Sequence, residues 1–221
     1  MKKPQITFTF VLAHAWVLMI FFGALMFDTL IVYPNTFHDV PRSLERAMAF
    51  ATVRGPGDFF PPLGFASWIT GIGSLILAWR VKAARYWILA SLVVIVSEGL
   101  FSMAFFWPRN TIMFTEGTAD HSVALLKQTA QEFEVGHWIR FALGAAAATT
   151  SFMGFLTFYR YRILARFARQ EAQVAVGGRS DASTNDSPEE GGRSYRNDPD
   201  TTHHVRQQME TEGRGFTPPR T

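Results

Sequence analysis

Three ionisable side chains recur at intervals of three residues in the stretch EVGHWIR, residues 134–140. At this spacing Glu134, His137 and Arg140 share one broad face of a helix. A carboxylate, an imidazole and a guanidinium on one face suit the binding of a polar or acidic small molecule, or acid–base chemistry on it. The alternative is a charged helix end that holds an internal arginine–aspartate pair.

A metal site could recruit Glu134 and His137 together with Asp28 or His38, because imidazole and carboxylate groups are common metal ligands. However, the chain has no strong ligand motif such as His-Glu-x-x-His, and it has no cysteine. A thiolate metal site and a disulfide are therefore excluded. We predict that the site uses neither a metal nor another cofactor.

A single carboxylate, Glu98, interrupts the apolar stretch between Trp87 and Trp107. Counted at ~1.5 Å per residue along a helix, Glu98 lies about 16 Å from Trp87, near the middle of the stretch. An ionisable group at such a depth in a membrane is a functional candidate, and a proton-transfer role would suit it. The alternative is a structural glutamate whose hydrogen bonds join two helices.

Other polar and aromatic residues fall near one end of the same apolar stretches. We predict a cavity that opens at this end, with Glu98 at its floor and a polar mouth. The predicted mouth residues are Asp28, Asn35, Arg109, Asn110, His137 and Arg140. The predicted catalytic residues are Glu98, His137 and Arg140, and the predicted substrate-binding residues are Asp28, Asn35, Asn110, Trp107 and Trp138. His14, in the first stretch, is predicted to hydrogen-bond between helices.

Four apolar stretches must position these residues, at about 8–32, 63–79, 87–107 and 138–159. A helix needs about 20 such residues to cross a bilayer, so we predict an all-α, four-helix membrane bundle over residues 1–169. The first stretch exceeds the ~7–15 apolar residues of a secretory signal, which favours a retained helix. Residues 170–221 have a composition typical of a disordered cytoplasmic tail.

Positive residues predict the orientation of the bundle. Three groups fall on one side if both termini are cytoplasmic. They are Lys2 and Lys3; Arg80, Lys82 and Arg85; and Arg160, Arg162, Arg166 and Arg169. The composition suggests a bacterium, and hence a multi-pass protein of the plasma (inner) membrane. Nucleic-acid binding is disfavoured because the basic residues lie beside the apolar stretches.

Two segments that connect the stretches have more structure than a plain linker. The stretch HDVPRSLERAMAFA, residues 38–51, predicts a short helix, with Leu44, Met48 and Phe50 on the membrane or on the bundle mouth. The first and third stretches end alike, in YPNTF and WPRNTIMF, and each proline is predicted to end its helix. This likeness raises the hypothesis of an internal duplication.

Four short spans, the Pro-Asn at residues 34–35, the Trp-Pro-x-Asn at 107–110 and HWIRFALGAAA from residue 137 resemble the anthrone-oxygenase-like family (DUF1772) over roughly residues 8–160. The resemblance implies a four-helix membrane bundle and, for some relatives, cofactor-independent oxygenation of polycyclic anthrones. Asn110, His137, Trp138 and Arg140 fall on the matching segments. In that chemistry they would position a phenolate and take its proton, so that oxygen reacts with a carbanion.

Three functions remain open at this point. An oxygenase acting on a lipophilic aromatic requires the cavity described above. A non-catalytic accessory or scaffold subunit of a membrane complex predicts a closed bundle in which Glu98 and Arg140 are merely paired, with an exposed apolar patch on the first long loop. A small transporter would need a homo-oligomer, in which Gly71 and Gly73 allow close packing between chains. The lipid bilayer is a partner in all three.

Overall fold

A computed structural model describes residues 2–184, and in this range the chain forms helices and short turns with no strand. Four stretches are long and apolar enough to cross a membrane: Pro4–Phe37, Pro56–Leu77, Lys82–Asp120 and Val123–Val174. The prediction of an all-helical fold with four such helices is confirmed. Residues 185–221 of the predicted tail lie outside the described residues, and residues 170–184 continue the last helix.

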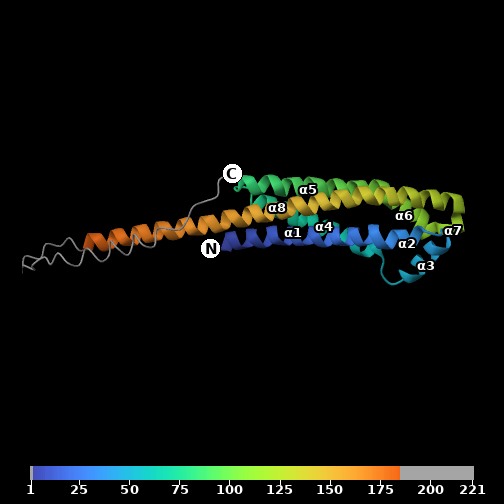
Figure 1. Cartoon of the computed structure of the whole chain (residues 1–221), viewed down its shortest axis with the longest axis horizontal. Coiled ribbons are helices and arrows are strands. Elements are labelled where there is room, and N and C mark those ends of the chain that lie inside the picture. Colours follow the sequence, from blue (N-terminus) through green and yellow to red (C-terminus); the bar gives the residue numbers. More distant parts are fainter. Residues whose placement is uncertain (1, 185–221) are drawn as a thin grey trace, which may run out of the picture. The chain divides into compact units, whose positions relative to one another are not determined.

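The four long helices are α1 (Lys2–Phe27), α4 (Pro56–Leu77), α5 (Lys82–Phe101) and α8 (Val123–Thr184). They run alongside one another within the compact unit Met1–Glu171 (Figure 1). Short helices gather at one end of this unit, which we call the loop end. They are α2 (Tyr33–Phe37), α3 (Arg42–Phe50), α6 (Trp107–Asn110) and α7 (Gly117–Asp120).

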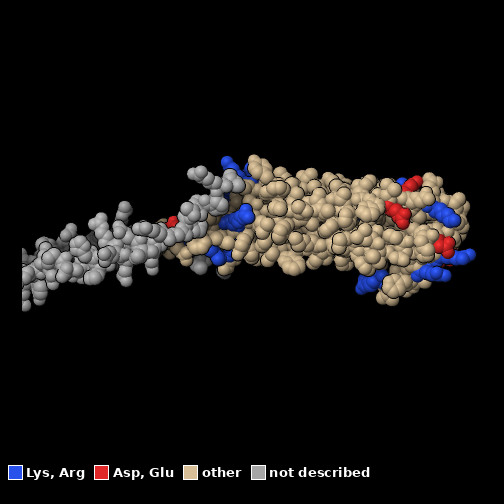
Figure 2. Space-filling view, viewed as in Figure 1, with Lys and Arg blue, Asp and Glu red and all other residues tan. Residues whose placement is uncertain are grey.

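The outside of the long helices is apolar. Trp16, Ile69, Ile76 and Leu100 are all more than half exposed. On the face seen in Figure 2, lysine, arginine, aspartate and glutamate lie toward the ends of the bundle, and the band between them carries no charge. Such an apolar girdle is costly in water and suits contact with lipid tails.

Two prolines do not end their helices, and the prediction that they would is wrong. A π-helical segment precedes each one: η1 (Asp28–Val32) before Pro34 and η2 (Ser102–Phe106) before Pro108. In both, the residue before proline donates its backbone N–H five residues back, Tyr33 to Asp28 and Trp107 to Ser102. A wider turn gives the proline ring the space that an α-helical turn denies it. The two segments therefore share one local structure; a duplicated origin stays a prediction.

The loop end has its own apolar core, built from Tyr33, Leu44, Phe106, Met113 and Phe133 among others. The predicted short helix is present as α3, over fewer residues than 38–51. Leu44 is buried and Met48 packs against this core, whereas Phe50 is 93% exposed. A further π-helical segment, η3 (Thr111–Glu116), leads to α7. This core fixes the ends of the helices that carry the buried polar residues.

His14 forms a buried polar layer that joins three helices away from the loop end. Its Nδ1 lies 3.3 Å from the Thr70 hydroxyl on α4, and its Nε2 lies 2.9 Å from the Ser91 hydroxyl on α5. Both hydroxyls also lie within hydrogen-bond distance of carbonyls of their own helices. This is the helix-joining role predicted for His14.

Gly71 and Gly73 face the inside of the same chain, so the hypothesis that they pack between chains is not needed to explain them. A Cβ atom on Gly71 would lie 2.9 Å from both the His14 ring and Leu92, and one on Gly73 would lie 2.5 Å from the Phe10 ring. The glycines therefore permit the close approach of α4 to α1 and α5.

We expect Gly71→Ala to destabilise the bundle by about 1–3 kcal/mol, because the hydrogen-bonded His14 ring cannot move away from the added methyl group. Gly64→Ala, in the same helix, is the matched control, since a Cβ there meets nothing within 4 Å. Unfolding of both variants in detergent micelles measures the difference. Equal stability of the two variants would contradict the close packing at Gly71.

Candidate functional site

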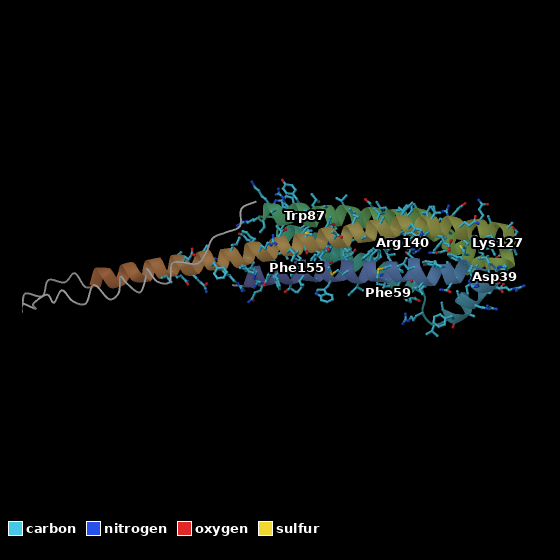
Figure 3. The ribbon with its side chains drawn as sticks, in the orientation of Figure 1. Asp39, Phe59, Trp87, Lys127, Arg140 and Phe155 are labelled. Atoms are coloured by element: carbon cyan, nitrogen blue, oxygen red, sulfur yellow. The ribbon has the colours of Figure 1, made fainter. Side chains whose placement is uncertain are left out.

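Glu98 and Arg140 form a buried ion pair that joins α5 to α8. The Arg140 Nε donates to Glu98 Oε1 over 2.8 Å, and the Ser102 hydroxyl donates to the same oxygen over 2.8 Å. Glu98 is 3% exposed and Arg140 is 7% exposed. Figure 3 labels Arg140 within the bundle, on α8. Two of the three predicted catalytic residues are therefore in direct contact.

His137, the third predicted catalytic residue, bridges α1 and Arg140. Its Nδ1 lies 3.3 Å from the Thr29 hydroxyl, which itself donates to the Leu25 carbonyl over 2.7 Å. Since the Thr29 hydroxyl proton is donated to the Leu25 carbonyl, we infer that Nδ1 of His137 carries the imidazole proton and donates a hydrogen bond to the Thr29 oxygen. Nε2 is then an acceptor, 3.4 Å from Arg140 Nη1. This network holds a neutral imidazole in one orientation.

Asp28 carries a buried carboxylate oxygen that lacks a partner. Among the described residues, its Oδ2 is the one buried side-chain oxygen or nitrogen atom that makes no hydrogen bond. Arg140 is near enough to act on Asp28 electrostatically. An unsatisfied carboxylate oxygen in a protein interior is costly, and such atoms often mark catalytic or binding groups.

Aromatic rings enclose the imidazole and the guanidinium. The His137 ring centroid lies 4.1 Å from that of Tyr33, 5.0 Å from Phe106 and 5.2 Å from Phe133. The guanidinium carbon of Arg140 lies 4.8 Å from the Phe106 ring centroid and 5.2 Å from that of Phe60. Cation–π contacts of this kind stabilise a buried arginine, and flat apolar walls suit an aromatic ligand.

Both π-helical segments begin at this cluster. Asp28 and Thr29 open η1, and Ser102 opens η2. Single π-helical turns inside α-helices are frequent at functional sites, because they displace side chains from α-helical register. We define the buried cluster as Asp28, Thr29, Glu98, Ser102, His137 and Arg140.

Sequence reasoning missed Thr29, Ser102 and the aromatic walls. Ser102 had a usable signal, because it follows Glu98 by four residues and so lies on the same helix face. The only sequence signal for Thr29 was that it follows Asp28 directly. The aromatic walls gave no signal, since phenylalanine is common throughout this chain.

The other predicted site residues are not brought to the buried cluster. Asn35 is exposed and donates to the Ile31 carbonyl, and Asn110 is half-buried. Trp107 and Trp138 are each 54% exposed on the outside of the bundle. Arg109 pairs with Glu132 over 2.7 Å, with its guanidinium over the Phe105 ring.

A cavity of about 270 Å³ lies at the loop end, between the α2–α3 connection and the start of α8. Its lining consists of Phe37, His38, Asp39, Val40, Lys127, Ala130, Gln131 and Glu134. Figure 3 labels Asp39 and Lys127 at this end. None of the six residues predicted for the cavity mouth lines it, and Glu134 lies here rather than in the buried cluster.

Within residues 2–184, no group of three or more histidine, aspartate or glutamate side chains is arranged to hold a metal ion. A scan against protein-family models finds no match, and searches of curated proteins and of solved structures find none either.

Proposed function

We propose that this protein is an integral membrane enzyme of the anthrone-oxygenase-like type, acting on a lipophilic aromatic with an acidic C–H or hydroxyl group. The observation that carries the proposal is the Asp28 carboxylate oxygen, buried in the cluster without a hydrogen bond to a described residue. If the Glu98–Arg140 ion pair served stability alone, the bundle would not need Asp28 as a second carboxylate without a hydrogen bond. The resemblance of residues 107–110 and of the stretch from residue 137 points the same way.

In this proposal Asp28 takes the substrate proton, because the other carboxylate, Glu98, is engaged by two donors. Arg140 stabilises the resulting oxyanion. Its Nε and Nη1 are used within the cluster, whereas Nη2 makes no hydrogen bond to a described residue and remains available. Neutral His137 holds the guanidinium in place, which makes it a positioning residue.

The electron-rich carbanion then reacts with O₂, which dissolves readily in lipid. Overall, a CH₂ group and O₂ become a carbonyl group and water, so the reaction balances without an added reductant. The aromatic walls at Tyr33, Phe106 and Phe133 would contact the flat rings of the substrate and exclude water from the anion.

The cavity at the loop end provides an entrance in this proposal. Phe37 lines it, the Phe37 ring stacks on Tyr33 at 5.5 Å, and Tyr33 in turn contacts His137. Movement of two rings would thus join the cavity to the buried cluster. We further propose that the termini are cytoplasmic and the loop end faces outward from a bacterial inner membrane, as the distribution of basic residues favours.

The test is oxygen consumption with anthrone, using the full chain in lipid nanodiscs. We expect a rate above that of empty nanodiscs, with one anthraquinone formed for each O₂ consumed. A rate equal to that of empty nanodiscs, together with no binding of anthrone, would contradict the enzyme proposal.

A second candidate is an accessory subunit of a membrane complex, and two observations favour it. Glu98 and Arg140 are paired with each other, and Phe50 and Val53 are exposed apolar side chains on the first long loop. Absence of anthrone turnover, with co-purification of one stoichiometric membrane protein, would favour this candidate.

A further inference from the structure

The end of α3 and the turn that follows it present the two most exposed large apolar side chains among those described in the loop-end region. Phe50 is 93% exposed and Val53 is 86% exposed. In α3 the opposite side packs inward, where Leu44 is buried. Because the inward side of this amphipathic helix is packed, the projecting turn has no partner among residues 2–184.

The turn lies at the level where α4 would enter a bilayer. Val53 is three residues before Pro56, the first residue of α4, so extended chain allows at most about 11 Å between them. Phe60 in α4 lies against the Arg140 guanidinium, and Arg140 is two residues from the exposed Trp138. From Trp138 to Tyr159 the helix rises about 31 Å, close to the hydrocarbon thickness of a bilayer.

Exposed aromatic side chains mark the same level. Trp107, Trp138 and Phe59 are all substantially exposed. Phe59, labelled in Figure 3, belongs to the first turn of α4. Tryptophan is enriched where a membrane meets water. The projecting turn therefore stands beside the expected lipid headgroups rather than far out in solution.

Exposed arginines of this region can contact a phosphate-bearing surface. The side chains of Arg42, Arg46 and Arg54 are exposed, and none of the three guanidinium groups makes an ion pair or hydrogen bond with a described residue. Three acids share this segment: Asp58 accepts from the Gly55 N–H over 2.9 Å and Glu45 accepts from the Thr118 hydroxyl over 3.3 Å. The exposed Asp39 carboxylate makes no hydrogen bond or ion pair with a described residue. Unpaired arginines beside apolar side chains are typical of interfacial lipid contact.

We propose that the α3 turn, residues 50–54, is a lipid anchor. Phe50 and Val53 insert into the leaflet at the loop end, and Arg46 and Arg54 bind the phosphates of its headgroups. The anchor would hold the loop-end cap against the membrane beside the start of α4. This inference rests on the membrane insertion proposed above, but not on any catalytic activity.

Spin labels at single cysteines test the anchor cleanly, because the chain has no native cysteine. Val53→Cys is the test position. Ile69→Cys, on the exposed side of α4, is the bilayer control, and Ala119→Cys, exposed on α7, is the aqueous control. The full chain is labelled in nanodiscs of phosphatidylcholine and phosphatidylglycerol, and collisions with O₂ and with a water-soluble nickel chelate are compared.

We expect position 53 to resemble position 69, with O₂ favoured over nickel several-fold more than at position 119. Joint replacement of Arg46 and Arg54 by glutamine should lower that ratio at position 53. Nickel access equal to that at position 119 would overturn the anchor, and protection from both reagents would indicate a protein partner instead. Nickel access at position 69 would overturn the membrane insertion itself, and the anchor with it.

Discussion

Replacement of Arg140 by methionine is expected to destabilise the bundle by about 3–5 kcal/mol, the usual cost of removing one partner of a buried ion pair. Methionine retains much of the apolar volume of the arginine side chain, so the main loss is the electrostatic interaction with Glu98. Glu98 would keep only the Ser102 hydroxyl as a donor, inside an apolar bundle. Leaving a buried carboxylate without its cation is far costlier than never having buried the charge.

The control is the double variant Glu98→Leu with Arg140→Met. Replacing both partners of a buried pair by apolar groups is often neutral or stabilising, so the double variant should recover most of the lost stability. Reversible unfolding in mixed micelles measures the stability of the wild type, of each single variant and of the double variant, which together form a double-mutant cycle. If Arg140→Met alone is as stable as the wild type, Glu98 does not depend on the arginine, and the ion pair is not the structural centre of the bundle.

The helices and the ionisable face of α8 were predictable from the sequence, because both depend on local spacing. Four apolar stretches can only be satisfied as helices in a bilayer, and residues 137 and 140 share a face at any helix orientation. The pairing of Arg140 with Glu98 depends on something else. It requires the rotation and height of α5 relative to α8, which packing of side chains such as Phe105 against Gly136 determines.

Proline explains why Asn35 and Asn110 lie apart from the buried cluster. If the first and third helices ended at Pro34 and Pro108, Asn35 and Asn110 would lie on loops free to turn inward. Instead the π-helical turns carry both helices onward, and Asn35 points outward and bonds within its own helix. A π-helical turn rotates all later side chains about the axis, and no short sequence pattern announces it.

The two tryptophans lie apart from the buried cluster for a different reason. Their position at the ends of apolar stretches was read as the rim of a cavity, but the same position suits a lipid interface. Their exposure on the outside of the bundle supports the second interpretation. Sequence gives the height of a residue along a membrane helix more readily than the side that it faces.

Replacement of Asp28 by asparagine is expected to lower the rate of anthrone oxidation by about 10²–10⁴-fold, the usual contribution of a positioned general base. The amide retains the shape of the carboxylate but cannot take a proton. Stability should be unchanged or slightly higher, because a neutral amide costs less to bury without a partner than a carboxylate does. Asp120→Asn, on the exposed surface of α7, is the control and should keep full activity.

The two variants therefore separate catalysis from structure by opposite outcomes. Arg140→Met should reduce both stability and activity, whereas Asp28→Asn should reduce activity alone. The double variant at Glu98 and Arg140 should be stable but inactive, because it lacks the guanidinium that holds the oxyanion. A loss of stability in Asp28→Asn as large as that in Arg140→Met would make Asp28 part of the structural network. The enzyme proposal would then lose its base, and the accessory-subunit candidate would explain the buried cluster better.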